Sequence, residues 1–172
     1  AQRGRSDLVY QMINQDERPG YGYMLKQGAT SLTEAWNANL TTSHNHFMLG
    51  HITEWFYKDL VGIDGDPAGP GFKKIIIKPN PVGDLTWAKA SYDSERGKII
   101  SDWKRDSGTF TLAVEIPPNT TATVYLPAKA GTAILEGGKP LALSPGVTTL
   151  RDEANRKVLT IESGRYVFTS EF

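Results

Sequence analysis

The stretch Gly62-Ile-Asp-Gly-Asp-Pro-Ala-Gly-Pro-Gly71 divides the chain into two halves with different patterns. Glycine and proline are the strongest local breakers of regular structure, so we expect this stretch to be a turn-rich linker. The residues after it alternate between apolar and polar with a period of two, whereas those before it follow a helical period. The sequence therefore predicts two structural parts, residues 1–62 and residues 63–172.

The second part contains many short runs that are typical of β-strands. Lys73–Lys78 includes three consecutive isoleucines, and Asp93–Gly97 has the composition of a hairpin turn. The expected strands are Lys73–Lys78, Trp87–Tyr92, Lys98–Lys104, Phe110–Ile116, Thr121–Leu126, Ala133–Leu135, Val147–Leu150, Lys157–Ile161 and Tyr166–Thr169. Short strands at this spacing, with turn signals between them, predict an antiparallel β-sandwich over residues 63–172.

The first part reads as helical. Ser6 is a candidate N-cap for a helix from Asp7 to about Asp16, which Pro19-Gly20 would end. Tyr21–Thr30 is punctuated by glycine, so we expect a loop there. A longer helix is expected from about Ser43 to Val61.

The longer helix has a broad apolar face. At about 100° per residue, six apolar side chains share one arc: Met48, Leu49, Ile52, Trp55, Phe56 and Leu60. One short and one long helix cannot close such a core by themselves. Either the β half covers this arc, or partner helices are missing from the chain.

The composition limits the classes of function. The 172 residues contain 19 Lys and Arg and 19 Asp and Glu, so the formal net charge is zero. This balance argues against a nucleic-acid binder, which would show a basic excess. No apolar run approaches the roughly 18 residues of a membrane helix, so we expect no membrane partner. The chain has no cysteine, which rules out disulfides and thiolate metal sites and leaves the compartment open.

Candidate chemistry is concentrated between Gln27 and Tyr57. This stretch contains no Lys or Arg, but it has two carboxylates, two tryptophans and all three histidines of the chain: Glu34, Glu54, Trp36, Trp55, His44, His46 and His51. A carboxylate beside an indole, with no cation near it in sequence, can transfer protons. Aromatic rings with a few polar groups also suit a sugar pocket.

Each of these residues also has a purely structural interpretation. Glu34 could complete a capping box with Ser31 at a helix start, and His46 could either donate to a ligand oxygen or satisfy a backbone group. Glu54 has Lys58 four residues on, the favoured order for a helical ion pair on an exposed face. The histidines are not spaced by four as in helical zinc pairs, so we predict no metal site.

Several motifs resemble those of bacterial α-L-rhamnosidases. The segment Gly22-Tyr-Met-Leu-Lys-Gln-Gly-Ala-Thr-Ser-Leu-Thr-Glu-Ala-Trp36 is similar to the family's "GYM…GATT…E.W" segment. Ser43-His-Asn-His46, followed by Gly50 and Glu54-Trp55-Phe-Tyr57, resembles its "S.NH…G…EW.Y" helix. Three segments of the β half resemble the family's C-terminal sandwich: Ile76–Pro81, Ala88–Tyr92 and Ile116–Pro127.

The resemblance implies a fold and a reaction. These enzymes cleave terminal α-L-rhamnose with inversion, in an (α/α)6 barrel followed by a β-sandwich. It implies an α+β fragment, in which residues 1–62 are the last helices of the barrel and residues 63–172 are the sandwich that braces it. Glu34 would be the general base, His46 would contact the sugar and Trp36 would flank the site, with no cofactor. The partners would be rhamnose-containing glycans or glycosides and the remainder of the catalytic barrel, in a periplasmic or secreted bacterial location.

One departure limits this expectation. The family's general acid lies in an acidic motif far upstream. Nothing here matches that motif, because Asp16-Glu-Arg18 resembles it only superficially and stands in the wrong place. An inverting hydrolase needs both an acid and a base, so we expect the chain to be inactive alone. The alternatives are a non-catalytic carbohydrate-binding or structural module, or an interaction protein whose exposed helix face pairs with another chain.

Overall fold

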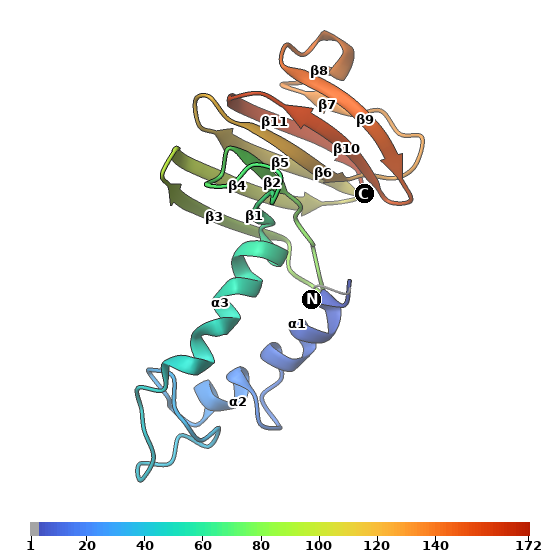
Figure 1. Ribbon diagram of the computed structural model, residues 1–172. Helices are drawn as coiled ribbons and strands as arrows, with labels where there is room; N and C mark the ends of the chain where they lie inside the picture. Colours follow the sequence, from blue (N-terminus) through green and yellow to red (C-terminus); the bar gives the residue numbers. More distant parts are fainter. Residues whose placement is uncertain (1–3) are drawn as a thin grey trace. The chain divides into compact units, whose positions relative to one another are not determined.

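The computed structural model describes residues 4–172, and they fall into two compact units (Figure 1). The first, the helical unit, comprises the chain up to Phe56 together with Val82–Asp84. The second, the β unit, comprises Tyr57–Pro81 and Leu85–Phe172. Among residues 4–172, no helix is both long and apolar enough to cross a bilayer.

The helical unit begins with two short helices, α1 (Ser6–Asn14) and α2 (Tyr21–Lys26). Helix α1 was expected, but Ser6 does not act as its N-cap. Instead Ser6 is the first helical residue, is buried, and accepts a hydrogen bond of 2.8 Å from Trp55 Nε1. The prediction of a loop over Tyr21–Thr30 was wrong for its first six residues. They form a helix of six residues despite Gly22, with Met24 buried.

The predicted long helix is present but begins later than Ser43. It consists of a 3₁₀ turn η1 (Phe47–His51), an α turn α3 (Ile52–Trp55) and a π turn η2 (Phe56–Leu60). Residues 43–46 are not helical because their backbone pairs with residues 32–34. Of the apolar arc, Trp55 and Leu60 are buried, whereas Met48 is 61% and Phe56 43% exposed.

The β unit contains two sheets. The strands are β1 (Ile63–Gly65), β2 (Lys74–Ile77), β3 (Trp87–Ser94), β4 (Gly97–Asp106), β5 (Thr109–Ile116), β6 (Thr121–Pro127), β7 (Leu135–Glu136), β8 (Lys139–Pro140), β9 (Val147–Glu153), β10 (Arg156–Ile161) and β11 (Gly164–Glu171), with a 3₁₀ turn η3 at Leu141–Leu143. The five-stranded sheet has the order β1-β2-β6-β10-β9 and the six-stranded sheet β3-β4-β5-β11-β7-β8 (Figure 1).

The sheets differ from the sequence prediction in several details. Strand β8 was not predicted, and the predicted strand Ala133–Leu135 is found as β7, Leu135–Glu136. Strand β1 lies within the predicted linker and pairs antiparallel with β2, with Ile63 opposite Ile77. Strands β2 and β6 pair in parallel, with Ile75 opposite Ala122, so the sandwich is not purely antiparallel. All other pairings between described strands are antiparallel.

The core of the β unit follows from the period-two pattern. Alternate residues of β5 are buried, as are the inward residues of β4, β6 and β11. The largest fully buried side chains come from both sheets: Trp103, Phe110, Phe168, Ile75, Ile77, Ile99, Leu112, Ile116, Leu126, Leu159, Ile161 and Val124. Each stabilises the fold by about 1.5–3 kcal/mol through removal of apolar surface from water.

Two buried side chains fix the start of the β unit to strand β4. Trp103 Nε1 donates to the carbonyl of Leu60 at 2.8 Å, and Ser101 Oγ donates to that of Val61 at 2.6 Å. Both donors are fully buried. The chain leaving the helical turn η2 is thereby held against the six-stranded sheet before β1 begins.

Candidate active site

The candidate residues Glu34, Trp36 and His46 lie on one looped segment of the helical unit. Its two arms are joined by backbone hydrogen bonds from Glu34 N to the Ser43 carbonyl, at 2.8 Å, and from His46 N to the Leu32 carbonyl, at 2.9 Å. The Ser31 hydroxyl donates to the carbonyl of His44 across the same pair of arms. Glu34 and His46 are twelve residues apart in sequence, and these bonds bring them close together on the two facing arms of one loop.

The tip of the loop is held by Asn39. Its side-chain oxygen accepts from the backbone and hydroxyl of Thr41, at 3.0 Å each. Its carbonyl accepts from the Thr42 hydroxyl, at 2.8 Å, and contacts His44 Nε2, at 3.1 Å. Asparagine commonly closes turns in this way because its side chain replaces a backbone acceptor. The loop is therefore internally braced.

Glu34 is exposed and is not a helix-capping residue. No helix starts near it, and the Ser31 hydroxyl bonds the opposite arm, so the capping-box alternative was wrong. One carboxylate oxygen, Oε2, accepts a hydrogen bond from Ser43 N at 3.3 Å. Within residues 4–172 the carboxylate makes no ion pair with a basic side chain. An oriented carboxylate that no cation neutralises can accept a proton.

His46 differs from the other two histidines in its bonding. His44 Nε2 contacts the Asn39 carbonyl, and His51 Nδ1 contacts the Met48 carbonyl at 2.8 Å. Within the described part of the chain, neither ring nitrogen of the half-buried His46 has a hydrogen-bond partner. The ring of His46 therefore does not serve a backbone group here and retains both nitrogens for a ligand.

Trp36 is held by Tyr21. The two rings meet edge to face, with centroids 5.4 Å apart and an interplanar angle of 81°. The Tyr21 hydroxyl donates to the Leu49 carbonyl at 2.6 Å, and burial raises the pKa of Tyr21 above its ordinary value. Sequence reasoning gave Tyr21 no role, because its contact with Trp36 spans fifteen residues and has no local pattern. Tyr21 thus links the loop that carries Trp36 to the turn η1.

The acidic and histidine side chains do not gather into a metal centre in the part of the chain that the structure describes. Among residues 4–172, no three His, Cys, Asp or Glu residues lie close enough together to hold an ion. Glu54 is exposed on α3. Its ion pair with Lys58 stays a prediction.

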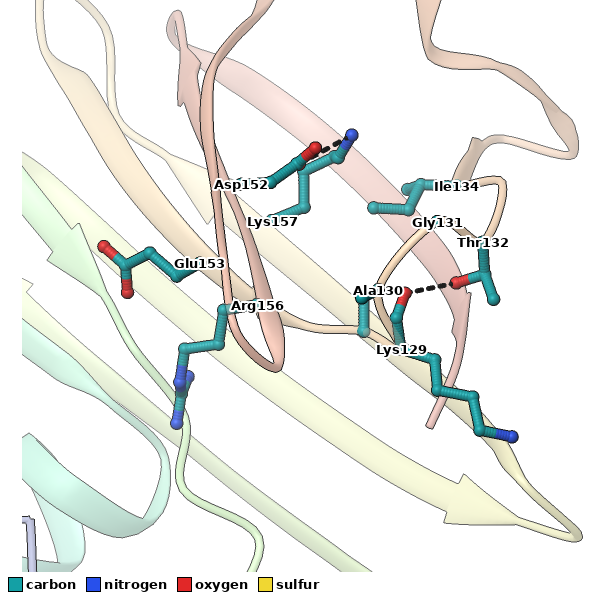
Figure 2. Close-up of a pocket in the computed structure, with 10 residues that line it drawn as sticks. Lys129, Ala130, Gly131, Thr132, Ile134, Asp152, Glu153, Arg156 and Lys157 are labelled. Carbon is teal, nitrogen blue, oxygen red and sulfur yellow. Dashed lines mark hydrogen bonds and ion pairs between the residues drawn. The ribbon is translucent and has the colours of Figure 1, made fainter.

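A separate shallow pocket, with a cavity volume of only about 20 Å³, lies in the β unit (Figure 2). It is bounded by the loop from Ala128 to Ile134 and by the β9–β10 hairpin. Its lysines are paired: Lys157 lies 2.8 Å from Asp152, and Lys129 lies 2.7 Å from Glu171. None of Glu34, Trp36 and His46 lines this pocket. Because both lysines are ion-paired and the guanidinium of Arg156 is bonded to protein carbonyls and Asn80, we assign no ligand to it.

Arg156, at the edge of this pocket, has a structural role. Its guanidinium donates to the carbonyls of Pro79 and Tyr125, at 3.0 Å each, and to the side chain of Asn80. Burial lowers the pKa of Arg156 from its ordinary value. These bonds fix the segment after β2 to strand β6.

Comparison with known families assigns both parts of the chain. Residues 1–60 match the model of the bacterial α-L-rhamnosidase six-hairpin glycosidase domain, and residues 62–139 match that of the bacterial α-L-rhamnosidase C-terminal domain. The chain belongs to the bacterial α-L-rhamnosidase family. The resemblance inferred from the motifs is therefore confirmed, and the chain corresponds to the C-terminal part of such a protein.

Individual α-L-rhamnosidases are similar over most of this chain. One from Streptomyces avermitilis is 34% identical over 134 residues, covering 73% of this chain and 13% of that protein. One from Formosa agariphila is 29% identical over 178 residues, covering 98% of this chain and 19% of that protein. The chain thus spans less than a fifth of the length of these relatives.

Solved structures of the family share the fold. The α-L-rhamnosidase of Dictyoglumus thermophilum superposes with a TM-score of 0.87 at 32% identity, over 99% of this chain and 19% of that one. The S. avermitilis enzyme, solved in complex with L-rhamnose, gives a TM-score of 0.86 at 29% identity, over 99% and 16%. The predicted fold class, last helices of an (α/α)6 barrel followed by an antiparallel β-sandwich, is confirmed, with the parallel pairing of β2 and β6 as the exception.

Proposed function

We propose that this chain is the C-terminal portion of a glycoside hydrolase that cleaves terminal α-L-rhamnose with inversion, and that Glu34 supplies its general base. Membership of the family supports the substrate class. The observation that carries the role of Glu34 is its carboxylate, which is exposed, oriented by Ser43 N and not paired with a cation among residues 4–172.

In this proposal Glu34 removes a proton from the attacking water. Oε2 is held by the backbone of Ser43, so Oε1 is the oxygen that accepts the proton as the water oxygen bonds to the anomeric carbon. The leaving oxygen takes its proton from a carboxylic acid elsewhere in the enzyme, about 6.5–9.5 Å from the base in inverting enzymes. We assign that acid to the remainder of the barrel, so the chain alone would not turn over substrate.

The other two candidate residues would bind the sugar. The ring nitrogens of His46 would bond a rhamnose hydroxyl, as its lack of a protein partner in the described residues suggests. Trp36, oriented by Tyr21, would border the sugar with its indole ring. Residues 1–62 would complete the barrel, and residues 63–172 would form the domain that supports it.

The stereochemistry of the product tests the reaction class. Proton NMR of the whole enzyme acting on an aryl α-L-rhamnoside should show the β-anomer of rhamnose first, with the α-anomer growing only by mutarotation. Release of the α-anomer first would mean a retaining mechanism, in which a carboxylate forms a covalent intermediate, and would refute the role given to Glu34. The isolated chain of residues 1–172 should release no rhamnose under the same conditions.

A further inference from the structure

Trp87 is the most exposed of the four tryptophans of this chain. It is 66% exposed on strand β3, whereas Trp55 is 5% exposed and Trp103 is fully buried. Strand β3 lies at the edge of the six-stranded sheet, next to β4, with β5 and β11 following beyond β4 (Figure 1). An exposed indole is a large apolar surface in water, and tryptophan is enriched where proteins bind ligands.

The side chains around Trp87 are defined by the strand register. Lys104 stands directly opposite Trp87, and Thr111 and Thr169 continue the same row across β5 and β11. The next row begins with Lys89 opposite Asp102. All of these side chains point outward, because the alternate positions Trp103, Leu112 and Phe168 are buried in the core. We call these six residues the Trp87 face: Trp87, Lys89, Asp102, Lys104, Thr111 and Thr169.

The charges on this surface are largely neutralised by one another. Lys89 Nζ lies 2.9 Å from Asp102, and one row further on Arg165 Nε lies 3.1 Å from Glu115. Lys104 makes no ion pair within residues 4–172. The surface therefore combines one bare aromatic ring with hydroxyl, ammonium and carboxylate groups and little net charge.

We propose that the Trp87 face binds glycan, with Trp87 stacking on the apolar side of one sugar ring. The hydroxyls of that sugar and its neighbour would bond Lys104 and the Lys89–Asp102 pair, which together present donors and acceptors. A polyanion would require a basic excess, which the ion pairs remove. A protein partner is disfavoured because the centres of protein interfaces are depleted of charged residues. This binding would be independent of hydrolysis at Glu34 and would hold polymeric substrate on the β unit.

Affinity electrophoresis of the 172-residue chain tests this proposal. Native gels would contain either a neutral L-rhamnan, a polymer of rhamnose, or xyloglucan, which is neutral and lacks rhamnose. We expect retardation in at least one gel, weakened about tenfold or more by Trp87→Ala, a size of effect usual for truncating a central aromatic contact. Leu150→Ala, which removes an exposed apolar side chain (51%) from the other sheet, is the matched control and should not change retardation.

Further variants separate this site from the rest of the chain. Trp87→Phe keeps an aromatic ring and should retain most of the binding, even if Trp87→Ala disturbs folding. In the xyloglucan gel, which contains no rhamnose for the proposed hydrolytic site to bind, Glu34→Gln and His46→Ala should leave retardation unchanged, so failure of the hydrolytic site would not mimic failure of this one. The proposal is overturned if the unaltered chain is not retarded in either gel, or if Trp87→Ala is retarded equally. Sedimentation velocity showing self-association that depends on Trp87 would also overturn it.

Discussion

Replacing Trp103 by Phe should strongly destabilise the β unit. The indole is fully buried, donates to the Leu60 carbonyl at 2.8 Å and stacks on Phe110 with centroids 5.8 Å apart. Phe has no donor, so the Leu60 carbonyl loses this partner in a buried setting, at a cost of about 1–3 kcal/mol. The smaller ring also leaves a void, which adds about 1–2 kcal/mol. Together these terms predict a loss of about 2–5 kcal/mol, large against a typical total of about 5–15 kcal/mol.

Urea unfolding followed by far-UV circular dichroism measures this loss without relying on tryptophan fluorescence. The transition midpoint should fall while its slope stays the same, since the slope reports the surface exposed on unfolding. Trp87→Phe makes the same chemical change at an exposed position and should shift the free energy of unfolding by no more than about 0.5 kcal/mol. A loss below about 1 kcal/mol for Trp103→Phe would refute the inference that this indole anchors the segment after the helical turn.

The remaining predictions concern the helical unit. The Tyr10 hydroxyl donates to Asp84, and this hydrogen bond raises the pKa of Tyr10. The bond should therefore stabilise the fold fully below the ordinary tyrosine pKa of about 10. Its contribution should be lost as the pH rises through the higher pKa of the folded state. Thermal unfolding between pH 8 and 11 should show this decline, and Tyr10→Phe should make it shallower; an unchanged profile would contradict the assignment. In the whole enzyme, His46→Ala should weaken inhibition by free rhamnose about tenfold or more, whereas His44→Ala should not, since the His44 ring is bonded to Asn39; equal effects would remove the distinction between them. Glu54→Gln should change stability by less than about 1 kcal/mol and leave activity near normal, because Glu54 is exposed; lost activity would assign it a direct role.

Strand positions could be predicted from the sequence more completely than their pairing. The alternation in Phe110–Ile116 identifies a half-buried strand, and β5 spans Thr109–Ile116. Alternation of apolar and polar residues does not show whether two neighbouring strands run parallel or antiparallel. The parallel pairing of β2 with β6 was therefore missed. Strand β1 was missed because its three residues, Ile63–Gly65, lie in a glycine- and proline-rich run. Its strand character comes from pairing with Ile75–Ile77, a contact that local sequence does not encode.

The helical unit shows where local rules fail. The period-based prediction placed the start of the long helix at Ser43, but residues 43–46 form backbone bonds with residues 32–34 instead. The same pairing excludes the capping box that Ser31 and Glu34 offered as an alternative, because the Ser31 hydroxyl bonds the opposite arm. Tertiary bonds of this kind override helix propensity. Glycine punctuation also hid α2, whose turns form in spite of Gly22.

The candidate site was predicted partly by residue type and partly by resemblance. The absence of Lys and Arg between Gln27 and Tyr57 drew attention to Glu34 and Glu54, and the resemblance selected Glu34. The structure shows the carboxylate of Glu34 without an ion pair within residues 4–172. The distinction between His46 and the other histidines could not be predicted, because it depends on which carbonyls the loop brings near each ring. The roles of Glu34, His46 and Trp36 in hydrolysis stay predictions.

The rate of the Glu34→Gln variant tests the role of Glu34 most directly. Gln keeps the size of the side chain and an oxygen that can accept the bond from Ser43 N, but it cannot take a proton from water. In the whole enzyme, kcat on an aryl α-L-rhamnoside should fall by about 10²–10⁴, with KM and melting temperature nearly unchanged. A variant that keeps more than about a tenth of the normal kcat would contradict the assignment of Glu34 as the general base.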